Sequence, residues 1–278
     1  MFAILWASAS TATKIGLTAA HPLVIAQLRF MIAATIMLFF SHIVRRHPLP
    51  KGRVWKYLTI YGLLNITVYL GCYVVAMQHV TAGVGALAIA TNPLFISFLS
   101  VFFLKKKLQP AIIIAIILGT SGVMIASWPL LKQASVTASG LLLLLFAMLS
   151  YSAGAIYFSA KDWNKLNLFT INGWQTFIGG ILLLPFTAIT YHSSYNHFTF
   201  TFLISVLWLA IPVSVFAVQL WLWLLQTNAI KAGLWLFLCP VFGFIMAGWL
   251  VHDIINGYTI AGVLLVMTGL FLAQRSSK

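Results

Sequence analysis

Apolar runs of about twenty residues, separated by short polar gaps, follow one another along nearly the whole chain. A run of this length lets one helix cross a hydrocarbon core of about 30 Å. Charge clusters and gaps rich in Pro, Gly, Asn and His delimit the runs. They cover residues 1–18, 23–44, 54–77, 82–104, 110–128, 138–160, 168–191, 201–226, 230–251 and 257–274. We therefore predict an all-α integral membrane protein with ten transmembrane helices.

The scarcity of charged side chains excludes an ordinary soluble domain. Only 6% of the 278 residues are charged and 62% are hydrophobic, whereas soluble domains are typically about 25% charged. Such a chain cannot cover a water-exposed surface, so the lipid bilayer is its expected partner. Cys72 and Cys239 lie in apolar runs without metal-ligand spacing, and we therefore expect neither a disulfide, nor a metal, nor a cofactor.

The net charge of +14 comes from cations placed in the gaps, and this argues for membrane topology and against a nucleic-acid partner. Cytoplasmic loops are enriched in Lys and Arg. If the N-terminus is inside, only Lys132 falls on the outer side. The thirteen cations on the inner side are Arg45, Arg46, Lys51, Arg53, Lys56, Lys105, Lys106, Lys107, Lys161, Lys165, Lys231, Arg275 and Lys278. We predict a cell (inner) membrane protein with both termini in the cytoplasm.

The two halves of the chain resemble each other. Residues 2–9 (FAILWASA) match residues 146–153 (FAMLSYSA) at an offset of 144, and Asn92-Pro93 falls on Cys239-Pro240 at an offset of 147. Because each half holds five spans, the second half enters the membrane from the opposite side. We predict two inverted five-helix repeats, residues 1–130 and 138–275. Inverted repeats recur in secondary transporters, with the substrate site near the midplane between them.

Short motifs in this order resemble the EamA-like family of the drug/metabolite transporter superfamily, over nearly the whole chain. The motifs are Trp6-Ala7-Ser8 with Lys14, Leu28-Arg29-Phe30, Asn92-Pro93, Cys239-Pro240, Gly119-x-x-Gly122, and Gly262 with Gly269. The resemblance implies ten helices around a central cavity and export of amino acids or other metabolites. Family members usually carry a Glu just after spans four and nine. Lys106 and Asp253 stand there instead, which argues against a paired-glutamate mechanism.

Two cations, Lys14 and Arg29, fall inside or at the ends of predicted spans, where a charge costs about 2.5–3.5 kcal/mol at the bilayer centre. They either attract an anionic group of a substrate or snorkel to the external interface. Trp6 and Ser10 share a helix face with Lys14. These three residues form the first candidate group for substrate binding.

A second group of candidates follows helical stripes in spans three and eight. Tyr61, Asn65, Tyr69 and Tyr73 recur every four residues and therefore share one face, which either lines a cavity or bonds a neighbouring helix. Aromatic walls with a few polar groups suit aromatic or amphipathic organic substrates. In span eight, Pro212, Gln219 and Trp223 also share a face, whereas Trp221 is expected to fill a helix contact. From this group we select Asn65, Tyr69, Tyr73, Gln219 and Trp223 as substrate-binding candidates.

Pro93 and Pro240 stand mid-span at equivalent positions. A proline inside a helix removes a hydrogen bond and favours a kink, so the pair either forms hinges or is tolerated in packing. Asn92 is a candidate for binding the freed carbonyl or the substrate.

The sequence predicts a secondary transporter, an exporter or facilitator of small organic metabolites such as amino acids, working by alternating access. No nucleophile, acid/base pair or metal cluster has the spacing of an enzyme site. A membrane-embedded enzyme and a non-transporting lipid-handling or scaffold protein are the alternatives. Both acids lie in predicted gaps, which favours uniport or exchange over proton symport.

Overall fold

A computed structural model describes residues 1–80, 82–133, 137–250 and 257–275, and its regular elements are all helices. Asp253 and Lys278 lie outside these described residues. The first half contains seven α-helices and two π-helical segments within the described residues. They are α1 (Phe2–Leu17), α2 (Pro22–Leu38), η1 (Phe39–Val44), α3 (Val54–Gly62), η2 (Leu63–Val68), α4 (Tyr69–Ala76), α5 (Ala82–Ile89), α6 (Asn92–Phe103) and α7 (Pro110–Gln133).

The second half repeats this order with small differences, again within the described residues. Its elements are α8 (Ala138–Ala160), α9 (Leu168–Ile189), the 3₁₀ turn η3 (Ser193–Tyr195), α10 (Phe200–Trp208), the π-helical segment η4 (Leu209–Ala217), α11 (Val218–Thr227), α12 (Ala229–Leu234), the 3₁₀ turn η5 (Trp235–Phe237), α13 (Leu238–Leu250) and α14 (Gly257–Arg275).

Five continuous helical rods in the described part of the chain are long and apolar enough to cross a bilayer. They are Pro22–Val44, Val54–Ala76, Ala138–Ala160, Leu168–Ile189 and Phe200–Thr227. Four shorter apolar helices accompany them, over Asn92–Phe103, Pro110–Ile125, Ala229–Gly243 and Ile260–Leu272. The protein is therefore an all-helical, multi-pass membrane protein. Ten complete crossings stay a prediction.

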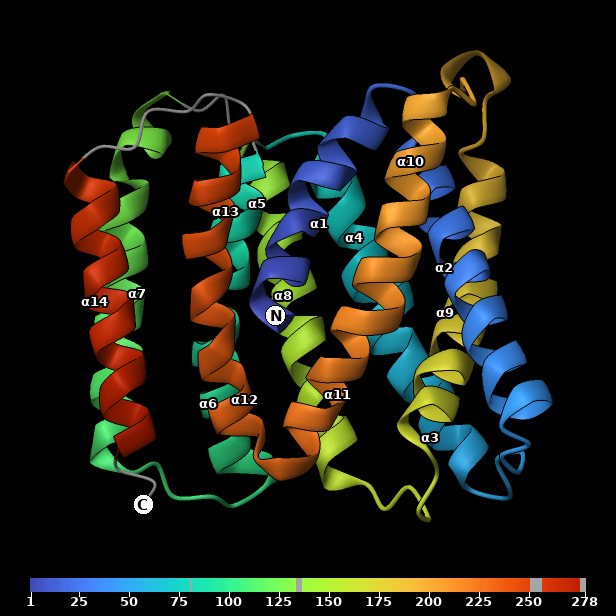
Figure 1. Cartoon of the computed structure of the whole chain (residues 1–278), viewed down its shortest axis with the longest axis horizontal. Coiled ribbons are helices and arrows are strands. Elements are labelled where there is room, and N and C mark those ends of the chain that lie inside the picture. Colours follow the sequence, from blue (N-terminus) through green and yellow to red (C-terminus); the bar gives the residue numbers. More distant parts are fainter. Residues whose placement is uncertain (81, 134–136, 251–256, 276–278) are drawn as a thin grey trace.

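Irregular segments recur at matching places in the two halves. The π-helical segment η2 interrupts the rod α3–α4, and η4 interrupts the rod α10–α11 at an equivalent point. A break separates α5 from α6, and the turn η5 separates α12 from α13. Figure 1 shows α3–α4 and α10–α11 running in opposite directions along the chain, so the corresponding rods are inverted relative to each other.

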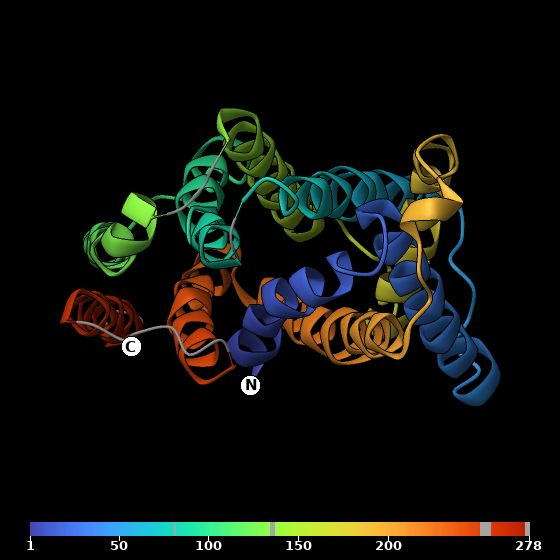
Figure 2. The ribbon, with the colours of Figure 1, turned by 90° about the horizontal axis from the view of Figure 1, so that it is seen from above.

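The two halves interlock as two facing rows of helices (Figure 2). The helices α7 and α14 pack together at one end of the rows, and α2 packs on α9 at the other. Between them, α1 contacts α13 and η4 of the second half, while α8 contacts α4 and α6 of the first. Each half therefore supplies helices that are packed inside the other.

Most basic connections gather at one end of the molecule, called here the lower end after its place in Figure 1. The connections α2–α3, α6–α7 and α8–α9 all lie there. Their cations are Arg45, Arg46, Lys51, Arg53, Lys105, Lys106, Lys107, Lys161 and Lys165. The opposite, upper end holds the connections α1–α2, α4–α5 and α9–α10, which contain no Lys or Arg. The charge asymmetry read from the sequence is thus an asymmetry between the two ends of the fold.

The predicted kinks at Pro93 and Pro240 need correction. Pro93 lies in the first turn of α6, after the break that follows Ile89, and Pro240 lies in the first turn of α13, after η5. A proline in the first helical turn removes no intrahelical hydrogen bond. Each of the two prolines therefore begins a half-helix, whereas Pro185 and Pro212 stand inside α9 and η4.

The contact between α7 and α14 depends on small residues. A Cβ atom added to Gly122 would lie 2.5 Å from the backbone oxygen of Gly262. We predict that Gly122→Leu lowers the free energy of unfolding by about 1–3 kcal/mol, as overpacking typically does. Thermal unfolding in detergent measures this. Gly257→Ala, at the start of α14 with no atom within 4 Å of the added Cβ, is the matched control. Equal melting temperatures would contradict the tight contact.

Candidate functional site

A small cavity lies between the two rows of helices and is lined by residues of both halves. Its volume is about 20 Å³, which is room for about one water molecule. The first half supplies most of its wall and the second half the rest. The lining residues are Trp6, Ala9, Arg29, Asn65, Tyr69, Leu70, Tyr73, Ile89, Val213 and Val218. In this structure the cavity is therefore too small for an organic solute.

Four of the predicted site residues meet at this cavity, namely Trp6, Asn65, Tyr69 and Tyr73. All four are buried. Tyr61, which precedes them in the same stripe, lies elsewhere: its ring packs 5.4 Å from the Phe158 ring. The π-helical segment η2 lies between Tyr61 and Tyr69. Its wider turns rotate the later residues relative to the earlier ones, which takes Tyr61 away from the cavity.

An aromatic cluster continues the cavity wall into the second half. The Tyr151 ring lies 4.7 Å from Tyr69, 5.7 Å from Trp6 and 5.4 Å from Trp221. Trp221 is fully buried and, as expected, fills a helix contact, with its ring 6.2 Å from that of Trp6 in the cavity wall. Among the described residues, no hydrogen-bond partner is found for the buried hydroxyls of Tyr73 and Tyr151 or for the Trp221 indole N–H. Buried polar groups normally have partners, and of these three groups the Tyr73 hydroxyl belongs to a residue that lines the cavity.

Arg29 places a positive charge in the cavity wall. Its side chain is only 3% exposed, and its Nε donates a hydrogen bond of 2.7 Å to the Ser214 hydroxyl. The guanidinium carbon also lies 5.5 Å from the centre of the Phe30 ring. The interpretation that Arg29 snorkels to the interface is therefore wrong. The side chain turns inward and joins α2 of the first half to η4 of the second.

A chain of buried hydrogen bonds extends from this point back to the first half. The Asn172 amide donates to the Ser214 carbonyl at 3.0 Å, and the Gln175 amide donates to the Asn172 side-chain oxygen at 3.0 Å. The Asn65 amide completes the chain by donating to Gln175 at 3.2 Å. The network therefore crosses between the halves twice, at Arg29 and at Asn65.

The sequence analysis missed Asn172, Gln175 and Ser214. A signal for the first two was present. With Thr176 they stand at positions i, i+3 and i+4 of a mostly apolar helix, so they share one face. Polar side chains grouped in this way need partners when lipid surrounds the helix. Ser214 gave no such signal, because an isolated serine in an apolar run bonds its own helix as readily as a neighbour.

Three other predicted site residues have partners away from the cavity. The Lys14 ammonium donates a 2.5 Å hydrogen bond to the carbonyl of Met77, the C-cap residue that follows α4. A cation at a helix C-terminus is favourable, so Lys14 acts as a helix cap. The Ser10 hydroxyl donates to the Ala7 carbonyl of its own helix at 3.0 Å. Asn92 accepts a 3.1 Å hydrogen bond from Ser152 and so joins α6 to α8.

The predicted face of span eight is displaced by its irregular backbone. Trp223 is 58% exposed on the outer surface, and Gln219 is half-buried without lining the cavity. The inward face of α11 carries Val218, Trp221 and Leu222 instead. The π-helical segment η4 precedes α11, and its wider turns shift the register, which a regular helical spacing does not anticipate. Trp223 is therefore a surface residue, and its prediction as a substrate-binding residue is wrong.

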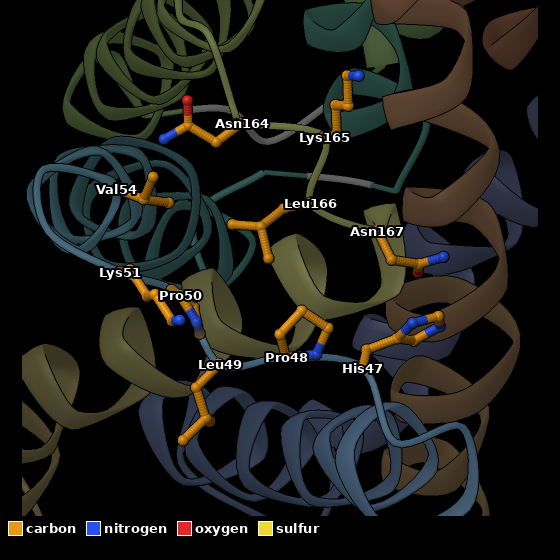
Figure 3. Close-up of a pocket in the computed structure, with 10 residues that line it drawn as sticks. All are labelled: His47, Pro48, Leu49, Pro50, Lys51, Val54, Asn164, Lys165, Leu166 and Asn167. Atoms are coloured by element: carbon orange, nitrogen blue, oxygen red, sulfur yellow. The ribbon is translucent and has the colours of Figure 1, made fainter.

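A larger pocket of about 400 Å³ lies at the lower end, between the α2–α3 and α8–α9 connections (Figure 3). Figure 3 shows His47, Pro48 and Lys51 on one side of it and Asn164, Lys165 and Asn167 on the other. Most of these side chains are exposed or half-exposed. This pocket is built from connections at one end of the fold and lies apart from the cavity between the halves.

No group of three or more His, Cys, Asp or Glu side chains in the described residues could hold a metal ion. Cys72 is half-buried and Cys239 is buried, and both are free thiols. The chemistry of the central site therefore consists of one guanidinium, aromatic rings, hydroxyls and amides. Such groups bind and orient an organic solute, and they provide hydrogen bonds and a charge without a nucleophile beside a base.

Known proteins are similar to this chain in sequence, and one solved structure is similar to it in fold. The EamA-like transporter family matches residues 1–128 and 138–274. Protein PecM of Dickeya dadantii is 27% identical over 274 residues, 97% of this chain and 88% of that protein. The uncharacterized transporter YoaV of Bacillus subtilis is 27% identical over 272 residues, 97% of this chain and 92% of that protein. A crystal structure with 17% identity covers 98% of this chain and 95% of its own at a TM-score of 0.82, so the fold is shared. The chain belongs to the EamA-like transporter family.

Proposed function

We propose that this protein is a secondary transporter, an exporter or facilitator, of small organic metabolites such as amino acids. The observation that carries the proposal is the small cavity between the inverted halves, with Arg29, Asn65 and aromatic residues in its wall. Membership in a transporter family supports the same function. A site between inverted repeats suits alternating access, because it can be exposed to either side when the halves move.

The small volume of the cavity requires such a movement. A space of about 20 Å³ cannot hold a metabolite, so cargo must enter a state in which the two rows have separated. We expect the breaks ahead of α6 and α13 to take up the motion, with Pro93 and Pro240 as the ends of the moving half-helices. Residues at helix ends can change their backbone angles without disrupting a continuous helix.

The proposed mechanism is uniport or exchange. Asp162, the acid in the described part of the chain, lies in the α8–α9 connection and accepts a 2.9 Å hydrogen bond from the Asn164 N–H. A proton relay through a membrane needs ionisable acids or histidines inside it. With no acid near the cavity among the described residues, the gradient of the cargo itself is the expected driving force.

The side chains around the cavity also argue against the two alternative functions, a membrane-embedded enzyme and a lipid-handling or scaffold protein. An enzyme would need a nucleophile, an acid/base pair or a metal near the cavity, and the described lining residues include none of these sets. A lipid-handling protein would need a groove open to the bilayer along its polar part, whereas Arg29 is enclosed between the halves. Both alternatives predict that no water-soluble metabolite crosses a membrane containing the purified protein.

Flux into liposomes is the direct test of this function. We expect purified protein to move at least one member of a panel of amino acids, nucleosides and cationic amphiphiles. Asn65→Ala and Tyr69→Ala should each lower flux about tenfold, because loss of one buried hydrogen bond or ring contact costs about 1–1.5 kcal/mol. The exposed residue Trp223 provides the matched control, and Trp223→Ala should leave flux unchanged. No flux for the whole panel would contradict the transporter function.

We also propose that the lower end faces the cytoplasm of an inner-membrane protein, with both chain termini on that side. The basic connections at the lower end support this orientation. Alkaline phosphatase fused after Lys278 should therefore be inactive, since it folds only outside the cytoplasm. The same enzyme fused after Ser194, in the α9–α10 connection at the upper end, should be active. The reverse pattern would overturn the orientation.

A further inference from the structure

The pocket at the lower end of the molecule has cations on both of its walls (Figure 3). Its volume of about 400 Å³ falls within the range of about 300–1,000 Å³ that is usual for small-molecule sites. Lys51 comes to it from the α2–α3 connection and Lys165 from the α8–α9 connection. None of the described residues that line it is an Asp or a Glu. The first and second halves of the chain therefore each contribute a positive charge to one pocket.

A second hollow, of about 330 Å³, adjoins the first, since His47 and Asn167 line both. Arg45 lines this second hollow, so three cations surround the two hollows together. Its remaining walls are Phe40 and Phe169, whose rings lie 5.5 Å apart. The site thus combines positive charge on one side with aromatic side chains on the other.

Asp162 is the acid that stands nearest along the chain, on the same connection as Lys165. It lines neither hollow, and its carboxylate accepts a 2.9 Å hydrogen bond from the Asn164 N–H within its own connection. One acid against three cations leaves an excess of positive charge around the hollows. An anion is therefore the ligand that these side chains favour.

The backbone around the hollows is held in an unusual conformation. Asn164 and Lys165 have φ values of 49° and 57°, and Arg46, between two lining residues, has a φ of 51°. Residues with a Cβ seldom adopt this left-handed region, and Lys and Arg have no short polar side chain to favour it locally. Strained residues of this kind cluster at sites that hold ligands. The two connections are therefore shaped around the hollows.

The protein surface beside the hollows is apolar, and this indicates what kind of anion binds. Leu49, in the pocket wall, is 56% exposed. Phe40, in the wall of the second hollow, is also exposed, as are Ile43 and Val44 on the same π-helical segment η1. Exposed apolar patches of a membrane protein are covered by lipid chains. A ligand that fits both surfaces has an anionic head and an apolar tail.

We propose that the two hollows bind the phosphate group of an anionic phospholipid from the leaflet at the lower end, with its acyl chains along η1. Basic pockets between transmembrane helices are suited to such headgroups. The lipid is a bound partner and not cargo, so this inference goes beyond the transport function and does not depend on it. Because the site joins a connection of the first half to one of the second, bound lipid should stabilise the protein.

The test titrates purified protein in a neutral detergent with dihexanoylphosphatidylglycerol, whose headgroup is anionic. Dihexanoylphosphatidylcholine, which has the same acyl chains and a zwitterionic headgroup, and inorganic phosphate are the comparison ligands. We expect the phosphatidylglycerol to raise the melting temperature. Half of the rise should occur at a concentration at least tenfold lower than with either comparison ligand, because several cations attract the net negative charge.

The double variant Lys51→Gln/Lys165→Gln locates the effect. Each cation near an anionic lipid strengthens binding about fivefold, so this variant should need about twentyfold more phosphatidylglycerol for the same rise. Lys106→Gln/Lys107→Gln is the matched control, since it removes the same charge from an exposed connection at the same end, outside both hollows. The control should respond as the wild-type protein does.

Three results would overturn the proposal. Equal stabilisation by the two lipids would show that the anionic headgroup is not recognised. Inorganic phosphate as effective as phosphatidylglycerol would make a soluble phosphate compound the occupant. An equal loss in both double variants would show diffuse attraction to the basic end and no site in the hollows. The wild-type comparison needs no variant, so it decides even if a variant fails to fold, and it involves no flux, so it leaves the transport function to its own test.

Discussion

The hydrogen bond between Arg29 and Ser214 is the interaction on which the centre of this protein depends. It holds a buried charge of the first half against the π-helical segment η4 of the second. From Ser214, buried amides lead through α9 to Asn65 in η2, the matching π-helical segment. In a bilayer, where water cannot replace lost partners, such a chain fixes how the halves meet. It is also the contact that must rearrange when the cavity opens.

The two π-helical segments explain why the polar residues meet at this level. Each widens one rod at its middle and turns the following residues toward the opposite half. Breaks ahead of α6 and α13 add a second pair of irregular points at equivalent positions. Irregular backbone within a membrane is tolerated where protein surrounds it or where it lines a cavity. These four irregular points lie inside the packed rows of helices, whereas the third π-helical segment, η1, ends α2 at the lower end.

The five long rods were predictable from the sequence because lipid requires long apolar runs, and Ala138–Ala160 agrees with its predicted range at both ends. The breaks inside the predicted runs 82–104 and 230–251 were not predicted. The π-helical segments were not predictable, because no residue type specifies them. They move Tyr61 and Trp223 off the helix faces that a regular helical spacing assigns to them. Trp6, Asn65, Tyr69 and Tyr73 do lie together at the cavity. The sequence left two interpretations open for Arg29, because a side chain about ten ångströms from a helix end can reach the membrane interface or turn into the protein. The hydrogen bond to Ser214 shows that it turns into the protein.

A structure of the wild-type protein with the central cavity open to one side tests the central claim most directly. In that structure the Arg29 side chain is predicted to have left the Ser214 hydroxyl, and the cavity between the halves is predicted to be larger than about 20 Å³. An open cavity with the hydrogen bond between Arg29 and Ser214 still in place would contradict the account.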